Sequence, residues 1–241
     1  MRGKRSDKMA KLKRLLVPRF WTIPKKAYKW TVSPRPGAHK KFEGIPLQVV
    51  MRDILKLAET GKEVRLIIKM GGVLVDSRKR KDHAFAVGLM DVISIPKIKK
   101  QYRVLPCKKG LELKETSGKD VGKKICRIKN KTMVRKGKMQ LNLHDGRNVL
   151  VEKDVYKTGD SVLIEVPAQK IVDHVKLEKG NLGLITKGKN SGRMGKMKKV
   201  ILSKRGEPGK VVFRLENKDV EIRKDRVIVV GKEKPMIKLG D

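Results

Sequence analysis

The 241-residue chain is long enough for two or three small domains, and it carries 62 Lys and Arg against 25 Asp and Glu, a formal net charge of +37. Self-repulsion of that size destabilises a free compact fold unless a polyanion offsets it, which argues against an isolated small-molecule enzyme. No run of about 18 apolar residues, secretory leader or lipidation signal is found, and the charge is spread along the whole chain. We therefore expect a nucleic acid, and no membrane, as the partner.

The first 46 residues differ from the rest of the chain. They contain five of the ten prolines, five of the nine aromatic residues, and 14 Lys or Arg against two acidic residues. We expect this basic arm to have no core of its own, to pack its aromatic rings onto a neighbouring domain, to be mobile until RNA binds, and to place its charges on phosphate. A mobile basic tail with no packing role is the alternative, but such tails are normally poor in aromatic residues. The phosphate ligands expected in the arm are Lys4, Arg5, Arg14, Lys40 and Lys41.

Residues 47–97 are expected to form a compact α+β unit. Apolar residues from Leu47 to Ala58 follow helical spacing, and Gly61 is expected to end that helix. A second helix is expected over 62–70, then strands over 73–75 and 92–95, with a charged turn over 76–82. A basic helix face is often merely solvated, but a second basic cluster in the turn favours RNA binding. The expected RNA ligands are Lys62, Arg65, Lys69, Arg78, Lys79, Arg80 and Lys81.

The remaining residues predict two small β units, 98–170 and 171–241, because turn signals recur at short intervals. Strands of the first are expected at 102–105, 111–115, 125–128, 139–151 (a hairpin around Asp145-Gly146) and 161–166. Strands of the second are expected at 182–185, 199–202, 211–215, 220–222 and 227–230.

A basic glycine loop spans residues 188–195 of the second β unit. It lacks the Lys-Ser/Thr ending of a nucleotide-binding P-loop, and the residues after it predict a strand rather than a helix. Its glycines allow a close approach to a ligand, which we expect to be a phosphodiester backbone. The expected ligands are Lys187, Lys189, Arg193 and Lys196.

Residue types that carry catalysis or hold metals form no known motif in this chain. Cys107 and Cys126 are too few for a disulfide framework or a four-ligand zinc ribbon, and the four histidines lie far apart. No nucleophile elbow, zinc-protease motif or dinucleotide fingerprint occurs. We expect no catalytic residue, metal, cofactor or small-molecule substrate, and a reducing, cytoplasmic environment.

Several segments resemble one family of RNA-binding proteins. Residues 54–95, ILKLAETGKEVRLIIKMGGVLVDSRKRKDHAFAVGLMDVISI, resemble the α-L RNA-binding module, and residues 179–197, KGNLGLITKGKNSGRMGKM, are similar to the KOW motif. With the arm segment 14–41 and with residues 87–106, in this order, they resemble the archaeal and eukaryotic e-type family of small-subunit ribosomal protein four. Gly183 and Met197 depart from the bulkier or β-branched residues common in the motif, and the short tail after Val230 is typical of archaeal members.

The resemblance implies a multidomain α+β fold that is mostly β. Its parts would be the arm (1–46), an α-L module (47–97), a central small β-barrel (98–170) and a five-stranded KOW-type barrel (171–241). It also implies a non-enzymatic constituent of the small ribosomal subunit that binds and stabilises small-subunit rRNA, beside neighbouring ribosomal proteins in the cytoplasm.

Two alternatives remain open. The first is an RNA-modifying enzyme that uses the α-L module for targeting, as pseudouridine synthases do; the residues after the module leave little room for a catalytic domain. The second is a KOW-type transcription or translation factor, which must leave its target and would therefore be expected to carry far less net charge.

Overall fold

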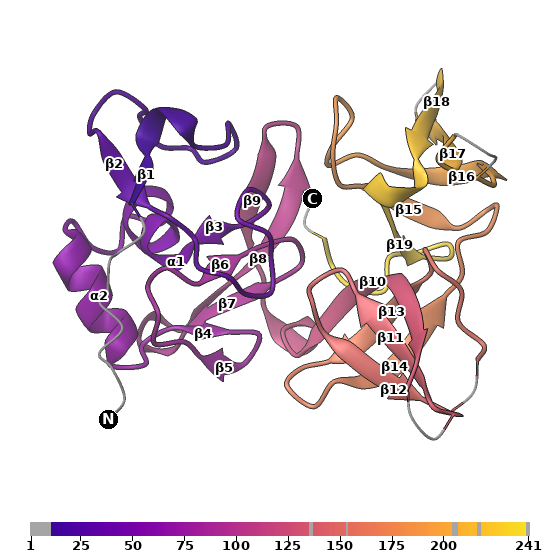
Figure 1. Ribbon diagram of the computed structural model, residues 1–241, viewed down its shortest axis with the longest axis horizontal. Helices are drawn as coiled ribbons and strands as arrows, with labels where there is room; N and C mark the ends of the chain where they lie inside the picture. Colours follow the sequence, from indigo (N-terminus) through magenta and orange to yellow (C-terminus); the bar gives the residue numbers. More distant parts are fainter. Residues whose placement is uncertain (1–10, 135–136, 153, 204–206, 216–217, 240–241) are drawn as a thin grey trace.

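The computed structural model describes residues 11–134, 137–152, 154–203, 207–215 and 218–239 (Figure 1). It contains three five-stranded sheets, two short two-stranded sheets and a few helical segments, which confirms the mostly β fold. Within the described residues, no helix has the length and apolar character needed to cross a bilayer.

The first sheet and the arm occupy the indigo and purple half of the molecule (Figure 1). The strand order is β5-β4-β7-β8-β9, and every neighbouring pair is antiparallel. The strands are β4 (Leu74–Val75), β5 (Arg78–Lys79), β7 (Val92–Ile95), β8 (Lys100–Cys107) and β9 (Gly110–Glu115). Two short antiparallel pairs accompany it: β1 (Lys11–Lys13) with β2 (Trp30–Val32), and β3 (Ile45–Pro46) with β6 (Ala86–Val87).

The helical part of this half divides differently from the sequence prediction. Helix α1 (Leu47–Val49) continues into a wider π-type turn, Val50–Ile54, and the chain then leaves the helix. Lys56 adopts a positive φ of 52°, which ends the helix before the apolar stripe is complete. The prediction that Gly61 ends this helix is wrong, because Gly61 is the first residue of α2 (Gly61–Lys69).

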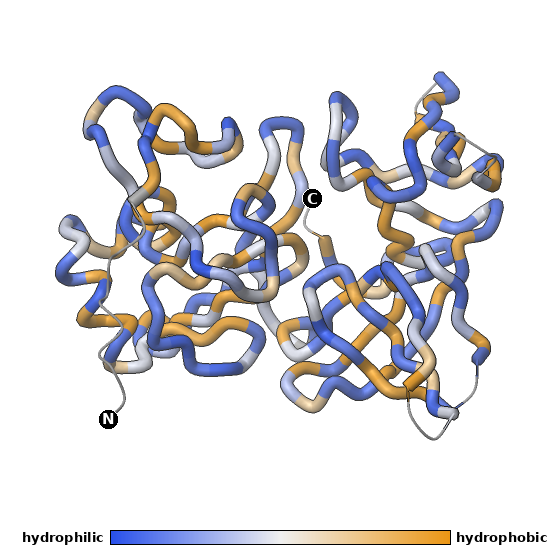
Figure 2. The backbone as a smooth tube through the Cα atoms, viewed as in Figure 1, coloured by the Kyte–Doolittle hydropathy of each residue, from blue (hydrophilic) through white to orange (hydrophobic). Residues whose placement is uncertain are grey.

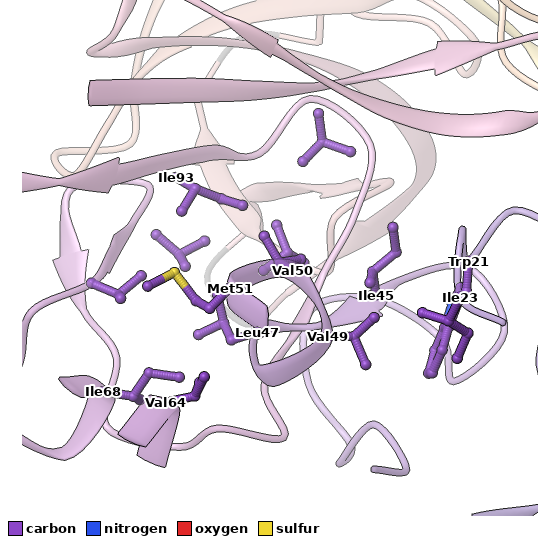
Figure 3. Packing of buried hydrophobic residues seen from close by; sticks show 14 of the residues in the cluster. Trp21, Ile23, Ile45, Leu47, Val49, Val50, Met51, Val64, Ile68 and Ile93 are labelled. Carbon is purple, nitrogen blue, oxygen red and sulfur yellow. The ribbon is translucent and has the colours of Figure 1, made fainter. Parts of the chain in front are cut away.

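Residues of the arm form part of the largest hydrophobic core (Figure 3). Trp21 is 2% exposed, and its indole Nε1 donates a hydrogen bond to the Gly44 carbonyl over 3.1 Å. Ile23 and Ile45 are buried in the same cluster, with residues of α1 and α2. The arm therefore has no separate core but completes the core of the neighbouring unit. The expectation that its aromatic rings pack onto a neighbouring domain is confirmed for Trp21, whereas Tyr28, Trp30 and Phe42 are exposed.

Two further sheets make up the other half. The second sheet has the order β12-β11-β10-β13-β14, and its strands are β10 (Lys123–Met133), β11 (Met139–Leu143), β12 (Asn148–Val151), β13 (Ser161–Glu165) and β14 (Lys170–Val175). The third has the order β18-β17-β16-β15-β19, and its strands are β15 (Leu182–Ile185), β16 (Met194–Ile201), β17 (Lys210–Leu215), β18 (Lys218–Arg223) and β19 (Val227–Gly231).

The predicted unit boundaries at 97/98 and 170/171 both separate strands that pair. β8 pairs with β7 across a short turn at Pro96–Ile98, so β8 and β9 belong to the first sheet and not to the central unit. β14, which the sequence pattern does not predict, pairs with β13 and belongs to the second sheet. Antiparallel strands joined by a tight turn stay in one sheet, whatever the local composition.

One hydrophobic cluster joins the three sheets. It contains Leu105 of β8, Ile125 of β10, Leu163 of β13, Leu184 of β15 and Ile228 of β19, all at most 5% exposed. The sheets are thus packed on one another through a shared core. Figure 2 shows hydrophobic and hydrophilic residues alternating along the strands and along α2, as expected for elements with one buried and one exposed face.

A buried ion-pair network lies where the first and second sheets meet. The ammonium group of Lys124 in β10 contacts three carboxylates, Asp76 at 2.9 Å, Asp91 at 2.5 Å and Asp145 at 2.9 Å. The guanidinium of Arg147 lies 2.5 Å from Asp76 and 2.9 Å from Asp145. Burial alone would lower the pKa of Lys124, but the three carboxylates raise it well above its ordinary value. The Lys124 ammonium group therefore stays charged inside the protein.

His39 of the arm adds an imidazole group to this network. Its Nε2 lies 2.8 Å from Asp91 Oδ2, and both side chains are buried. Burial alone would lower the pKa of His39. The charge and the hydrogen bond of the Asp91 carboxylate outweigh this effect, so the pKa of His39 is raised above its ordinary value of 6.5. A protonated His39 makes three cations, with Lys124 and Arg147, against the three carboxylates.

This charge balance predicts a pH dependence of stability. A histidine whose pKa is raised on folding contributes stability that is complete below about 6.5 and is lost as the pH rises through the folded value. The free energy of unfolding should therefore fall over that range, and His39→Gln should remove this component. Urea unfolding of both proteins at a series of pH values measures the difference. An unchanged pH profile in the variant would show that His39 is neutral in the fold.

Candidate nucleic-acid interface

Helix α2 carries the first group of predicted RNA ligands. Val64 and Ile68 are 0% exposed and anchor the helix to the core, which leaves the opposite side for the basic residues. Lys62 and Lys69 are exposed and Arg65 is half-buried, so the expected stripe exists on the surface. The helix begins with a capping box: the backbone N–H of Glu63 donates to Thr60 Oγ1 over 3.3 Å, and the Glu63 carboxylate accepts from the Thr60 N–H.

Removing this cap should loosen the start of the basic helix. Thr60→Ala is expected to lower the free energy of unfolding by about 1 kcal/mol, the usual cost of losing a threonine N-cap. Thr22→Ala, at an exposed position outside the helices and strands, is the matched control and should change stability by less than about 0.5 kcal/mol. Urea unfolding measures both values, and equal effects of the two substitutions would contradict the role of the cap.

The hairpin of β4 and β5 carries the second group. The expected seven-residue charged turn is shorter in the structure, because Arg78 and Lys79 pair with Val75 and Leu74 as a strand. The two linking residues, Asp76 and Ser77, both have positive φ, of 51° and 61°, as a tight two-residue hairpin turn requires. The buried Asp76 carboxylate, held by Lys124 and Arg147, fixes this turn in place.

The basic side chains of this hairpin differ in exposure. Arg78, Lys79 and Lys81 are exposed, whereas Arg80 is half-buried with its guanidinium 4.2 Å from the centre of the Phe85 ring. Burial lowers the pKa of Arg80 from its ordinary high value. A Cβ atom on Gly71, just after α2, would lie 3.5 Å from Cδ of Lys79. The hairpin and the end of α2 are thus neighbours and form one basic surface.

The glycine loop between β15 and β16 carries the third group, and all four predicted ligands there are exposed. Lys187 is 2.7 Å from Glu43 of the arm, which brings the loop beside the predicted ligands Lys40 and Lys41, also exposed. Gly192 has a φ of 86°, and a Cβ there would lie 2.8 Å from the backbone of Cys107. This glycine is required for the loop to approach β8, so its close contact is with the protein itself.

Arg14 differs from the other predicted ligands. Its side chain is 2% exposed, its Nε donates to the Pro24 carbonyl over 2.6 Å, and Asp53 lies 4.0 Å away. It also stacks against Tyr28 at 5.5 Å. Arg14 therefore stabilises the fold of the arm from the inside. Lys4 and Arg5 lie outside the described residues.

A pocket of about 440 Å³ lies beside the α2 stripe, and the sequence pattern does not predict it. Its walls come from the arm, from the helical segment that begins at Leu47, from α2 and from the residues that follow β5. The lining residues include Tyr28, Trp30, Thr31, Gln48, Arg65 and His83. Burial lowers the pKa of His83, and the nearby Arg65 lowers it further. The one feature of the sequence that could have indicated this pocket is the mixture of aromatic and basic residues over 28–35.

One group of side chains has ligand atoms close enough to hold a metal among the described residues: Cys126, His144 and Asp145 lie within 4.8 Å of one another. The Asp145 carboxylate is already 2.9 Å from Lys124 and 2.9 Å from Arg147. Burial raises the pKa of the Cys126 thiol, which donates to Asp145. A protonated thiol and a carboxylate already paired with two cations are poor ligands, so the group belongs to the buried ion network.

Comparison with known proteins gives consistent matches. A family described as ribosomal family S4e matches residues 98–171, and an RS4NT (NUC023) domain matches residues 9–42. The small ribosomal subunit protein eS4 of Methanocaldococcus jannaschii is 49% identical over 240 residues, covering 95% of this chain and 96% of that protein. That of Archaeoglobus fulgidus is 47% identical over 232 residues, with coverages of 95% and 97%. The crystal structure of the 30S ribosomal protein S4e from Thermoplasma acidophilum is similar, with a TM-score of 0.69, 30% identity and coverages of 79% and 96%.

Proposed function

The chain belongs to the ribosomal protein S4e family, and on that premise we propose that it is a structural constituent of the small ribosomal subunit that binds and stabilises small-subunit rRNA. The observation that carries this proposal is the basic surface formed by α2 and the β4–β5 hairpin. Lys62, Lys69, Arg78, Lys79 and Lys81 are all exposed on it. Such side chains bind phosphate and release counterions, while the shape of the RNA and stacking on its exposed bases determine position.

The same proposal covers the finer assignments. Residues 47–97 act as an α-L module and the third sheet as a KOW-type barrel, with the β15–β16 loop and the arm residues Lys40 and Lys41 on rRNA. The partners are rRNA and neighbouring ribosomal proteins, the location is the ribosome in the cytoplasm, and the protein has no enzymatic role. The net charge of +37 supports permanent association with a polyanion.

Washing purified ribosomes at high salt tests the proposal. A structural constituent should stay with the small subunit in one copy per subunit, because many contacts must break together. A translation or transcription factor of the KOW type should wash off. Loss of the protein in the wash, or its recovery mainly with free RNA polymerase, would contradict the proposal. Loss of one rRNA modification on deletion, with subunits otherwise intact, would favour the modifying-enzyme alternative.

A further inference from the structure

We propose that the pocket between the arm and α2 binds a single unstacked nucleobase from a single-stranded segment of the rRNA. This inference rests on the proposed function and specifies how one part of the interface works. The volume of about 440 Å³ falls in the range of roughly 300–1,000 Å³ that is typical of small-ligand pockets. The pocket adjoins the phosphate-binding stripe directly, since Arg65 belongs to both.

Two exposed aromatic rings at the pocket provide stacking surfaces. Tyr28 is 71% and Trp30 43% exposed, so a large part of each ring is open to a ligand. A cation lies over each ring, Arg14 at 5.5 Å from Tyr28 and Lys29 at 5.8 Å from Trp30. Bases of single-stranded RNA stack on such rings with little dependence on sequence, and the exposed Lys29 beside Trp30 suits an attached phosphate, whereas the buried Arg14 only supports the Tyr28 ring from within the fold.

Three buried polar atoms belong to side chains that line the pocket, and their chemistry matches the edge of a base. Thr31 Oγ1, Gln48 Oε1 and Arg65 Nε are buried and have no hydrogen-bond partner among the described residues. Buried polar atoms are normally paired, and each exception needs an explanation. The Gln48 oxygen can accept from a ring or amino N–H, the Arg65 Nε–H can donate to a carbonyl or ring nitrogen, and the Thr31 hydroxyl can do either. A nucleobase edge presents this mixture of donors and acceptors.

The charge of the walls favours RNA over a protein segment. Five of the lining residues are basic, and none of those described is acidic. Carboxylates behind the walls offset part of this charge, since Asp53 lies 2.9 Å from Arg52 and Asp82 lies 3.5 Å from Arg35. Arg65 still faces the pocket beside the exposed Lys62 and Lys69, which are placed to hold the phosphates on either side of an inserted base.

The test removes hydrogen-bonding atoms while keeping shape and charge. The double variant Thr31→Val with Gln48→Met should fold as the wild type does, because replacing unpaired buried polar atoms with apolar ones is neutral or stabilising. Its affinity for small-subunit rRNA transcribed in vitro should fall roughly tenfold, the effect of a lost pair of hydrogen bonds. The salt dependence should not change, because no phosphate contact is removed. The control is Thr132→Val with Gln140→Met, a cross-strand pair in β10 and β11.

Crosslinking adds a second readout. Ultraviolet irradiation of purified small subunits, followed by mass spectrometry, should join Tyr28 or Trp30 to one nucleotide of the rRNA. Wild-type affinity in the pocket variant, or a crosslink from these rings to another ribosomal protein, would overturn the base-binding inference and leave the proposed function intact. If the wild-type protein binds small-subunit rRNA no better than unrelated RNA of equal length, the proposed function fails as well.

Discussion

Replacing Lys124 with methionine should lower the free energy of unfolding by about 3–5 kcal/mol, the usual cost of removing one partner from a buried ion pair. Lys124 is 1% exposed and its ammonium group contacts Asp76, Asp91 and Asp145 together. Methionine has a similar length but no charge, so three buried carboxylates would share only Arg147 and His39. The pKa of Asp145, which Lys124 helps to lower to about 2 despite burial, should rise toward its ordinary value.

The same substitution at the surface is the control for this prediction. Lys198 lies 2.6 Å from Asp219, and the two side chains are 55% and 45% exposed. Lys198→Met should therefore change the free energy of unfolding by at most about 1 kcal/mol, as exposed ion pairs do. Urea unfolding monitored by circular dichroism measures both variants. A loss of less than about 1 kcal/mol in Lys124→Met would show that the network contributes no net stability.

The network also connects stability to the RNA surface. Asp76, which Lys124 holds, is one of the two turn residues that place Arg78 and Lys79 on the hairpin. A weakened network should therefore allow the hairpin turn to move, although no phosphate ligand has been replaced. The first and second sheets are thereby coupled to the geometry of the interface.

Some strands follow closely from the sequence, since β7, β13, β15 and β19 lie within one residue of their predicted ends. Local alternation of apolar residues and turn-forming residues decides these elements. The burial of Lys124 cannot be read this way, because Lys123 and Lys124 are adjacent and only the pleat of β10 determines which side chain points inward. Tertiary packing, not local pattern, selects the buried lysine.

One part of the candidate site can likewise be predicted from the sequence, and another part depends on tertiary packing. The α2 stripe can be predicted from the sequence, because its three basic residues lie within one helix at spacings of three and four residues, which places them on one face. The pocket is not visible, since Tyr28, Gln48, Arg65 and His83 come from four separate segments. Arg14 shows the converse error: a basic residue in a basic arm predicts a phosphate ligand, but the fold buries it beside Asp53.

Changing Lys62, Arg65 and Lys69 together to glutamine should weaken rRNA binding strongly without unfolding the protein. Glutamine is nearly as good a helix former as lysine or arginine, and the anchoring residues Val64 and Ile68 remain in place. The salt slope is about −0.9 per phosphate contact for duplex DNA and about −0.7 for single strands. Losing three contacts should therefore make the plot of log K against log[salt] shallower by about two to three units, and affinity should fall across related RNA sequences.

The control triple removes the same charge from another exposed region. Lys232, Lys234 and Lys238 in the tail are exposed, and their change to glutamine should leave the salt slope within about one unit of wild type. Equal weakening by both triples would mean that bulk charge alone governs binding and that α2 is not a specific contact. Unfolding of the α2 triple, seen by circular dichroism, would make the stripe structural. Thr31→Val with Gln48→Met should lower affinity at an unchanged slope, so a change of slope in the α2 triple reports its phosphate contacts. Arg65 lines the pocket as well, so part of the affinity that the triple loses belongs to base recognition.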